Sequence, residues 1–161
     1  MSYCYNPFPL DSWVSRLYKE MGIYKPEDID IRKIASKLDI HLLYSEKRSF
    51  ANEEDNFKLI NLNKFLDEIK QREIFFHELA HILRHEGYQY KLMAPAFRAL
   101  QEWEANRFTR YAAIPYHMLH YVDWNSPSLV KDMSEMFKVS EDLCEYRVNQ
   151  VYRNIKPKEV I

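Results

Sequence analysis

Apolar residues recur every three or four positions in two long stretches of this chain, a spacing typical of one buried face of an α-helix. The first stretch predicts a helix over Phe65–Arg84, with Asn63 as its N-terminal cap and Gly87 just beyond its end. The second predicts a helix that Pro95 opens and that runs to about Ala113. These two helices are the longest regular elements that we expect.

Two shorter helical patterns precede them. One covers Trp13–Met21, where Asp11 or Ser12 can cap the first turn. The other covers Ile31–Leu38 and follows Asp30, which is again a good cap. Each pattern has a single apolar stripe, so we expect both helices to cover a core.

The region between these helices and the long ones has the pattern of short strands. The runs His41–Tyr44, Ser49–Ala51 and Phe57–Leu62 are mostly apolar and are separated by polar turns. They predict a small β-sheet that precedes the helix over Phe65–Arg84. The fold class expected from the whole pattern is α+β and mainly helical.

The last part of the chain is again helical in pattern. Ser126–Pro127 opens one helix and Val139–Ser140 starts another, and both helices have an apolar side. We therefore expect a core over residues 1–115 and a C-terminal helical subdomain over residues 116–161 that packs on it.

Composition narrows the function classes. With 161 residues, 47% of them apolar, the chain can bury a real core, and its net charge of −1 is not that of a typical nucleic-acid-binding protein. No run of about 18 apolar residues predicts a membrane span, and the N-terminus lacks a signal-peptide pattern. Only two glycines are present, which argues against a glycine-rich phosphate loop. Cys4 and Cys144 are expected to be free thiols of a cytoplasmic protein.

The helix over Phe65–Arg84 contains the one arrangement that specifies a chemistry. His77 and His81 are one turn apart on the same face, so both imidazoles can reach a single ion, and Glu78 projects beside them. Two neutral imidazole nitrogens suit Zn²⁺, which lowers the pKa of a bound water so that a neighbouring carboxylate can take its proton. The pattern predicts a zinc hydrolase with one ion, with Glu78 as the base.

Two carboxylates of the next helix compete to be the third ligand, and periodicity separates them. Glu102 shares its face with mostly small residues, which would let this helix approach the histidines closely. Glu104 shares its face with bulky residues such as Phe97 and Phe108, where a ligand role is harder to place. We therefore predict Glu102 as the ligand, with Asn106 one turn on as a hydrogen-bonding neighbour that fixes its orientation.

The other histidines leave alternatives open. His41 at a strand start could be a further ligand, although a surface or half-buried position is the more frequent role. His85 continues the face of His77 and His81, so it fits either a place near the site or packing at the helix end. The group that stabilises the oxyanion could be Tyr88, Tyr111 or His85.

Three stretches together resemble the ImmA/IrrE family of zinc metallopeptidases. They are His77–His85, Glu102–Phe108 and the following Ile114–Pro115. Two departures, Ala80 in place of a common glycine and Tyr111–Ala113 in place of a more aliphatic run, remove no functional group. The order of elements over roughly residues 10–115 also agrees with the family, in which an edge strand beside the site holds the substrate in extended form.

Within this resemblance His77, His81 and Glu102 match the metal ligands, and Glu78 matches the catalytic base. The resemblance implies a small endopeptidase, of the kind that prophages and mobile elements encode, which cuts a helix-turn-helix repressor and so derepresses the element's genes. The partner is then a protein, with no direct contact to nucleic acid or membrane. The alternative is a metal-containing protein that regulates a transcription factor or toxin by association, without cutting it.

Overall fold

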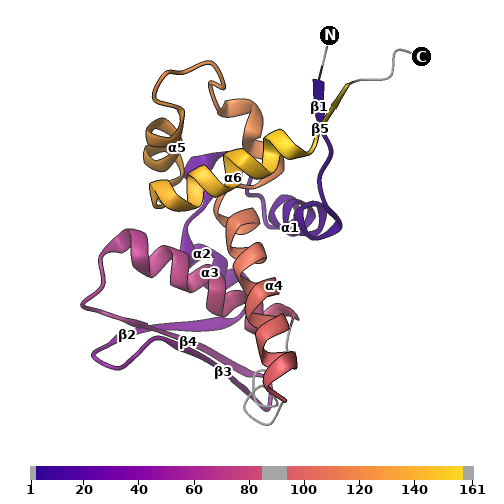
Figure 1. Ribbon diagram of the computed structural model, residues 1–161. Coiled ribbons are helices and arrows are strands. Elements are labelled where there is room, and N and C mark those ends of the chain that lie inside the picture. The colour runs from indigo at the N-terminus through magenta and orange to yellow at the C-terminus, as the bar shows by residue number, and fades with distance from the viewer. Residues whose placement is uncertain (1–2, 85–93, 158–161) are drawn as a thin grey trace.

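The computed structural model describes residues 3–84 and 94–157, and helices dominate it (Figure 1). Its one three-stranded sheet consists of β2 (Ile40–Ser45), β3 (Phe50–Glu54) and β4 (Phe57–Asn63). The strand order is β2-β4-β3, with β2 parallel and β3 antiparallel to the central strand. Ile60 and Leu62 of β4 have no exposed surface, so one face of the sheet belongs to the core. Because β4 is the central strand, β3 lies at an edge of the sheet.

The two long helices pack on each other beside this sheet. α3 (Glu68–Arg84) lies over the sheet, and α4 (Pro95–Ala113) crosses beside α3 (Figure 1). Phe75 and Phe76 of α3 are fully buried, as is Phe108 of α4. The aromatic core between the helices therefore fixes both of them relative to β3.

The N-terminal segment covers the other side of α4. α1 (Pro9–Glu20) packs on α4, and it ends in a turn where Gly22 adopts φ +77°, a conformation that side chains with a Cβ rarely adopt. The short 3₁₀ helix η1 (Pro26–Asp28) and α2 (Ile31–Lys37) lead from there into the sheet. Asp30 caps α2, as predicted, by accepting from the backbone N–H groups of its first turn.

The C-terminal segment consists of η3 (Tyr116–Tyr121), α5 (Leu129–Phe137) and α6 (Glu141–Arg153). Figure 1 shows this segment above the sheet and the two long helices. The strands β1 (Tyr3–Tyr5) and β5 (Ile155–Pro157) then pair antiparallel, so the two ends of the chain lie side by side. Buried residues of η3, α5 and α6 belong to the same core cluster as those of α1, the sheet and the long helices, and Tyr5 and Ile155 pack against it. The division into residues 1–115 and 116–161 stays a prediction.

The predicted α+β, mainly helical fold class is confirmed, but three helix starts differ from the prediction. α3 begins at Glu68 because Asn63 still belongs to β4, and Asp67 caps the helix by accepting from the backbone N–H of Lys70. α1 begins earlier, at Pro9, so neither Asp11 nor Ser12 is its cap. α5 begins only at residue 129, after the polar turn that includes Ser126 and Pro127.

The remaining sequence predictions can be placed briefly. Cys4 is exposed, Cys144 is buried and both are free, as expected. Gly87, expected at the end of the histidine helix, lies outside the described residues. Within residues 3–84 and 94–157, no helix has the length and apolar character needed to cross a membrane.

Candidate metal centre

α3 carries two histidines on the side that it leaves open to solvent. His77 and His81 are one turn apart, and their Nε2 atoms lie 3.3 Å from each other. Their side chains keep 24% and 12% of their surface exposed, whereas Phe76 and Leu79 on the other side of the helix are fully buried. The buried side fixes the helix, so both ring nitrogens are held in place where solvent and a substrate can reach them.

Glu102 reaches the same point from α4. Its Oε2 lies 2.9 Å from His77 Nε2, and its Oε1 lies 3.0 Å from His81 Nε2. Ala105, one turn further along α4, is fully buried, which lets the two helices approach closely at this level. The structure therefore brings together the three residues that the sequence singled out as metal ligands.

Glu104, the competing carboxylate, points elsewhere. It accepts a hydrogen bond from the Nε of Arg84, with a distance of 2.8 Å between the two atoms. This ion pair ties the end of α3 to α4. The periodicity that separated Glu102 from Glu104 in the sequence thus agrees with their directions in the structure.

The donor atoms of His77, His81 and Glu102 fit a metal ion. One ligand atom from each residue can be chosen so that all three lie within 4.8 Å of one another. Ligands that bind zinc tetrahedrally at the usual bond lengths lie about 3.3 Å apart, which is close to the distances seen here. Two imidazole nitrogens and one carboxylate also form a donor set that zinc enzymes use for catalysis. These residues could therefore hold zinc and leave a fourth position open.

Glu78 lies next to the histidines and is partly buried. Burial raises the pKa of the Glu78 carboxyl above its usual value, because removal from water disfavours the charged form. The charge of His77 and the backbone amide of Ala51 lower its pKa, whereas the neighbouring Glu102 raises it. A carboxylate with a raised pKa is the better proton acceptor near neutral pH, which suits a general base.

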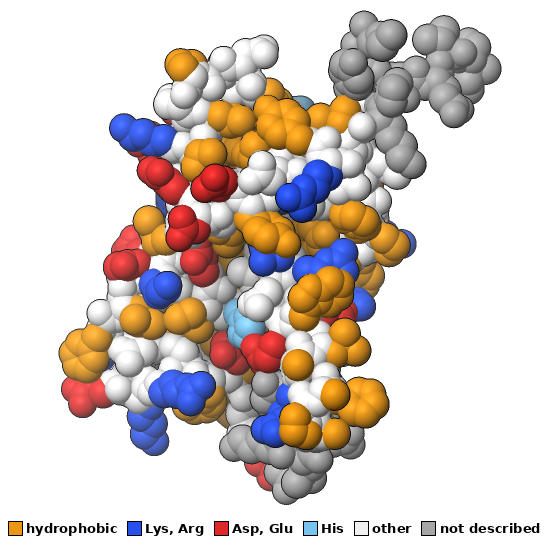
Figure 2. Space-filling view, viewed as in Figure 1, with side chains coloured by type: hydrophobic (Ala, Val, Ile, Leu, Met, Phe, Trp, Pro, Cys, Tyr) orange, Lys and Arg blue, Asp and Glu red, His pale blue; other side chains and the backbone are white. Residues whose placement is uncertain are grey.

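The site opens into a cavity of about 480 Å³ between α3 and the edge strand β3. Residues 50–53 of β3 line one wall, and His77, Glu78, His81 and Glu102 line the other. Figure 2 shows a histidine and two acidic side chains next to one another in a hollow of the surface. The cavity therefore places the outer edge of β3, with which no other described strand pairs, opposite the three potential ligands.

Sequence reasoning missed two groups in this cavity. Arg48 lines it, and the positive charge of Arg48 lowers the pKa of Glu78. Ala51 of β3 reaches Glu78 through its backbone, a contact that no side-chain pattern reveals. The pattern of Ser49–Ala51 did indicate a strand, and the family resemblance implied an edge strand beside the site. The sequence did not show that the two are the same strand.

Asn106 is not seen to contact Glu102. It is exposed, and among the described residues it has no hydrogen bond to the Glu102 carboxylate. It lines a neighbouring groove of about 630 Å³, to which His77, Arg110 and Tyr146 also contribute. Its role as a group that orients a ligand stays a prediction.

The other candidates lie away from the three ligands or outside the described residues. His41 stacks on Phe57, with 4.7 Å between the ring centroids, and lines a separate cavity beside β2. The hydroxyl of Tyr111 accepts from the guanidinium of Arg107 and does not line the cavity around Glu78. His85 and Tyr88, considered for the site and for the oxyanion, lie outside the described residues.

A mainly helical α+β fold, with two helix-borne histidines and a carboxylate beside an open sheet edge, defines a metallopeptidase-like class of protein. The comparison with known families agrees with this class. The chain belongs to the peptidase M78 family, described as the IrrE N-terminal-like domain, whose sequence profile matches residues 30–149. The resemblance seen in the sequence is confirmed.

Two relatives from Bacillus subtilis (strain 168) match almost the whole chain. The uncharacterized protein YqaB is 31% identical over 153 residues, which are 94% of this chain and 88% of that protein. The phage-like element PBSX protein XkdA is 33% identical over 147 residues, which are 89% of this chain and 73% of that protein. This chain therefore covers more than two thirds of each relative.

A solved structure titled Mycobacterium tuberculosis transcriptional regulator has a similar fold. The TM-score is 0.62 at 11% sequence identity, and the match covers 89% of this chain. It covers 47% of the other chain, so this protein spans about half the length of that structure. At so low an identity the likeness shows the fold alone.

Proposed function

We propose that this protein is a zinc-dependent endopeptidase that hydrolyses one specific peptide bond in a protein partner. The observation that carries the proposal is the convergence of His77, His81 and Glu102 beside Glu78 in an open cavity. Membership of a peptidase family supports the same class of reaction.

Each residue has a distinct task in this proposal. His77, His81 and Glu102 hold one Zn²⁺, which when bound polarises the scissile carbonyl and lowers the pKa of water. Glu78 accepts the proton of the attacking water and then donates it to the leaving amine. Its partial burial supports this cycle, because a carboxylate with a raised pKa can both accept and release a proton near neutral pH.

The edge strand β3 is proposed to hold the substrate. A peptide in extended form can pair with the free backbone groups of an edge strand, and residues 50–53 present such an edge to the cavity. A peptide bound there would pass directly in front of Glu78. Backbone pairing would supply general affinity, so specificity has to come from other contacts.

The proposed partner is a helix-turn-helix repressor of a prophage or mobile element. The family resemblance suggests this substrate class, and one relative carries the name of a phage-like element protein. Cleavage would destroy the repressor and switch on the element's genes. Since such repressors act on DNA, the proposal places the protein in the cytoplasm of a bacterial host.

The test is to incubate the purified, zinc-loaded protein with the repressor encoded beside it and to weigh the products by mass spectrometry. We expect one defined cut. Glu78→Gln should keep the metal and slow the cut by about 10³-fold, since general-base catalysis typically contributes about 10² to 10⁴. Glu68→Gln, which changes an exposed carboxylate in the first turn of the same helix, is the matched control and should cut normally.

Two results would reject the peptidase proposal. One is unchanged cleavage by Glu78→Gln, which would remove the proposed base from the mechanism. The other is an intact repressor that forms a stoichiometric complex with the metal-loaded protein, which would favour regulation by association without cutting.

A further inference from the structure

A second cavity lies where α4 meets α6, and its lining is rich in arginine and aromatic side chains. It has a volume of about 690 Å³. Three arginines line it, namely Arg107, Arg110 and Arg153, together with rings that include Phe8, Trp103 and Tyr146. No carboxylate is among the described residues that line it. We call it the arginine cavity. Figure 2 shows basic and apolar side chains interleaved over this part of the surface.

The three arginines lack acidic partners. Arg107, Arg110 and Arg153 form no ion pair with any of the described residues. Two other arginines, Arg84 and Arg147, do pair with carboxylates. The cations of the arginine cavity therefore keep donors that a bound anion could use.

Aromatic rings contact two of these guanidinium groups, those of Arg107 and Arg110. The Cζ of Arg110 lies 3.5 Å from the ring centroid of Tyr146. The Cζ of Arg107 lies 4.7 Å from the ring of Trp103 and 5.4 Å from that of Phe8. A stacked ring covers the flat face of a guanidinium group. The N–H donors at the edge of the group stay available. The groups are thus ordered in advance for a planar anion such as a carboxylate.

Electrostatics in the cavity favour an anion. Burial lowers the pKa of Arg110, and the like charge of Arg107 lowers it further. An uncompensated pair of neighbouring cations costs stability, and the rings offset only part of that cost. A negative group placed between them would relieve the repulsion.

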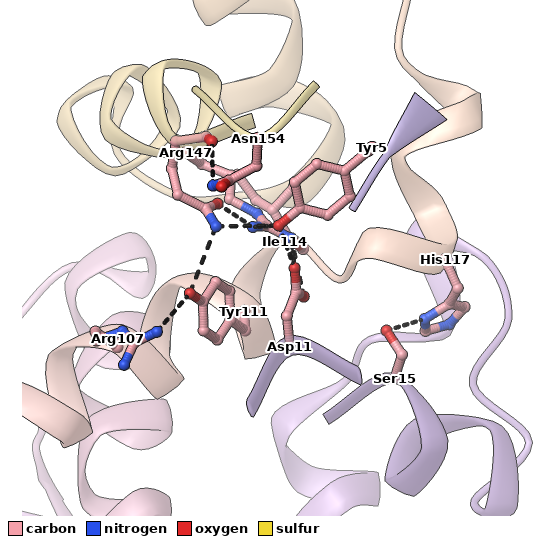
Figure 3. A network of polar contacts seen from close by, with 10 residues as sticks. Tyr5, Asp11, Ser15, Arg107, Tyr111, Ile114, His117, Arg147 and Asn154 are labelled. Atoms are coloured by element: carbon pink, nitrogen blue, oxygen red, sulfur yellow. Dashed lines mark hydrogen bonds and ion pairs between the residues drawn. The ribbon is translucent and has the colours of Figure 1, made fainter. Parts of the chain in front are cut away.

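The floor of the arginine cavity is rigid. Figure 3 shows the Arg107 guanidinium donating to the hydroxyl of Tyr111, and the amide of Gln150 bonds the same hydroxyl. Gln150 in turn accepts a hydrogen bond from Arg147, which is fully buried. The cavity is therefore built on the polar network that locks α6 to the rest of the fold.

The arginine cavity and the cavity around Glu78 each share lining residues with one groove. Arg110 and Tyr146 line both the arginine cavity and the groove of about 630 Å³. His77 lines both that groove and the cavity around Glu78. A chain bound in this groove would therefore lie next to both His77 and Arg110.

We propose that the arginine cavity binds an acidic segment of the protein partner, away from the bond that is cut. The identity of that partner rests on the proposed function, but binding to the cavity does not require catalysis. Guanidinium groups recognise carboxylates through paired, charge-assisted hydrogen bonds, which would supply the specificity that backbone pairing lacks.

A carboxylate-bearing peptide fits better than a nucleic acid. The groove of about 630 Å³ is lined by three carboxylates, those of Asp67, Glu73 and Asp142, beside the cations Lys70 and Arg110. A phosphate backbone that runs along it would meet more acidic than basic side chains. The chain also has a net charge of −1, whereas nucleic-acid binding usually leaves a basic stripe. A compact group of three cations suits a few acidic side chains.

The test measures binding of a short fluorescent peptide rich in glutamate to the full-length Glu78→Gln protein by anisotropy. The double variant Arg110→Gln, Arg153→Gln should bind about tenfold more weakly, because charge-assisted hydrogen bonds are lost. Arg16→Gln, an exposed cation on α1, is the matched control and should bind normally. The same peptide with lysine in place of glutamate should not bind.

The outcomes separate this proposal from the peptidase proposal. Equal binding by the double variant and the control, or tighter binding of single-stranded DNA than of the peptide, would overturn it. Arg153→Glu changes an exposed side chain and repeats the test if the double variant does not fold. Acidic-peptide binding without any cleavage of a repressor would leave the arginine cavity standing and reject the peptidase.

Discussion

Two polar clusters lie in this small protein, and they differ in how they meet water. In the metal centre the side chains of His77, His81 and Glu102 are 24%, 12% and 39% exposed. In the other cluster Arg147 and Asp11 are fully buried and joined by two hydrogen bonds of 3.0 and 3.1 Å. The first cluster is open to solvent and the second is sealed.

The sealed cluster is complete in itself. Besides Asp11, the Arg147 guanidinium donates to the backbone carbonyl of Ile114 and to the hydroxyl of Tyr5 (Figure 3). A buried charge whose donors are all matched gains no further partner, and it fixes the segments that it joins. In the open cluster two imidazole nitrogens and a carboxylate converge instead, and together these groups form a donor set for a metal ion. The fully hydrogen-bonded Arg147 cluster therefore indicates a structural role, and the convergence of His77, His81 and Glu102 indicates a binding site.

The largest effect is expected from breaking the sealed cluster. Arg147→Met should lower the free energy of unfolding by about 3–5 kcal/mol, because Asp11 would be left buried without its partner. Urea denaturation of the metal-free protein measures this change. Arg16→Met, at an exposed position, should cost little, and the double variant Asp11→Leu, Arg147→Met should recover part of the loss. A cost below about 1 kcal/mol for Arg147→Met would show that the network does not hold the fold.

In the open cluster, removal of a ligand should change the affinity for zinc. Glu102→Ala should weaken zinc binding by at least about a hundredfold, as expected when one of three ligands is removed. Glu104→Ala should leave zinc affinity nearly unchanged, since Glu104 pairs with Arg84 and does not share the three-ligand cluster. Competition with a coloured zinc chelator gives both affinities. The reverse ranking would make Glu104 the third ligand.

The same comparison explains what the sequence could and could not predict. The open cluster depends on local spacing, so helix periodicity placed His77 and His81 on one face and separated Glu102 from Glu104. The sealed cluster joins Asp11 to Arg147, which are 136 positions apart, and no periodic pattern links them. Asp11 was therefore interpreted as a helix cap, a role that its place near a helix start equally suits.

The sheet shows an intermediate case. The three strands were predicted close to their observed positions, because strand patterns are local. Their order was not, because it depends on the parallel pairing of β2 with β4, which leaves β3 at the edge. The start of α3 was wrong for a related reason. Asn63 is a good cap by type, but its backbone pairs with Ser45 of β2, so the helix can begin only after a turn.

The smallest expected effect is the loss of stability in acid that His117 causes. Like the sealed cluster, His117 has its hydrogen bonds satisfied within the protein. The ring nitrogens of His117 lie 3.0 Å from the hydroxyl of Ser15 and 3.0 Å from the carbonyl of Ile23, so its hydrogen bonds are satisfied. Burial lowers the pKa of His117 below its usual value. The unfolded chain therefore binds this proton more readily than the folded protein, and stability should fall as the pH drops through the unfolded pKa of about 6.5.

Melting temperatures of the metal-free protein at about pH 7.5 and about pH 5.5 measure this effect, since the two values lie on either side of the unfolded pKa. The wild type should lose stability on acidification, and His117→Gln, which keeps a polar side chain but cannot take up the proton, should lose less. His41→Gln, at an exposed position of β2, is the control and should behave like the wild type. If His117→Gln loses as much stability as the wild type, His117 does not carry the acid sensitivity.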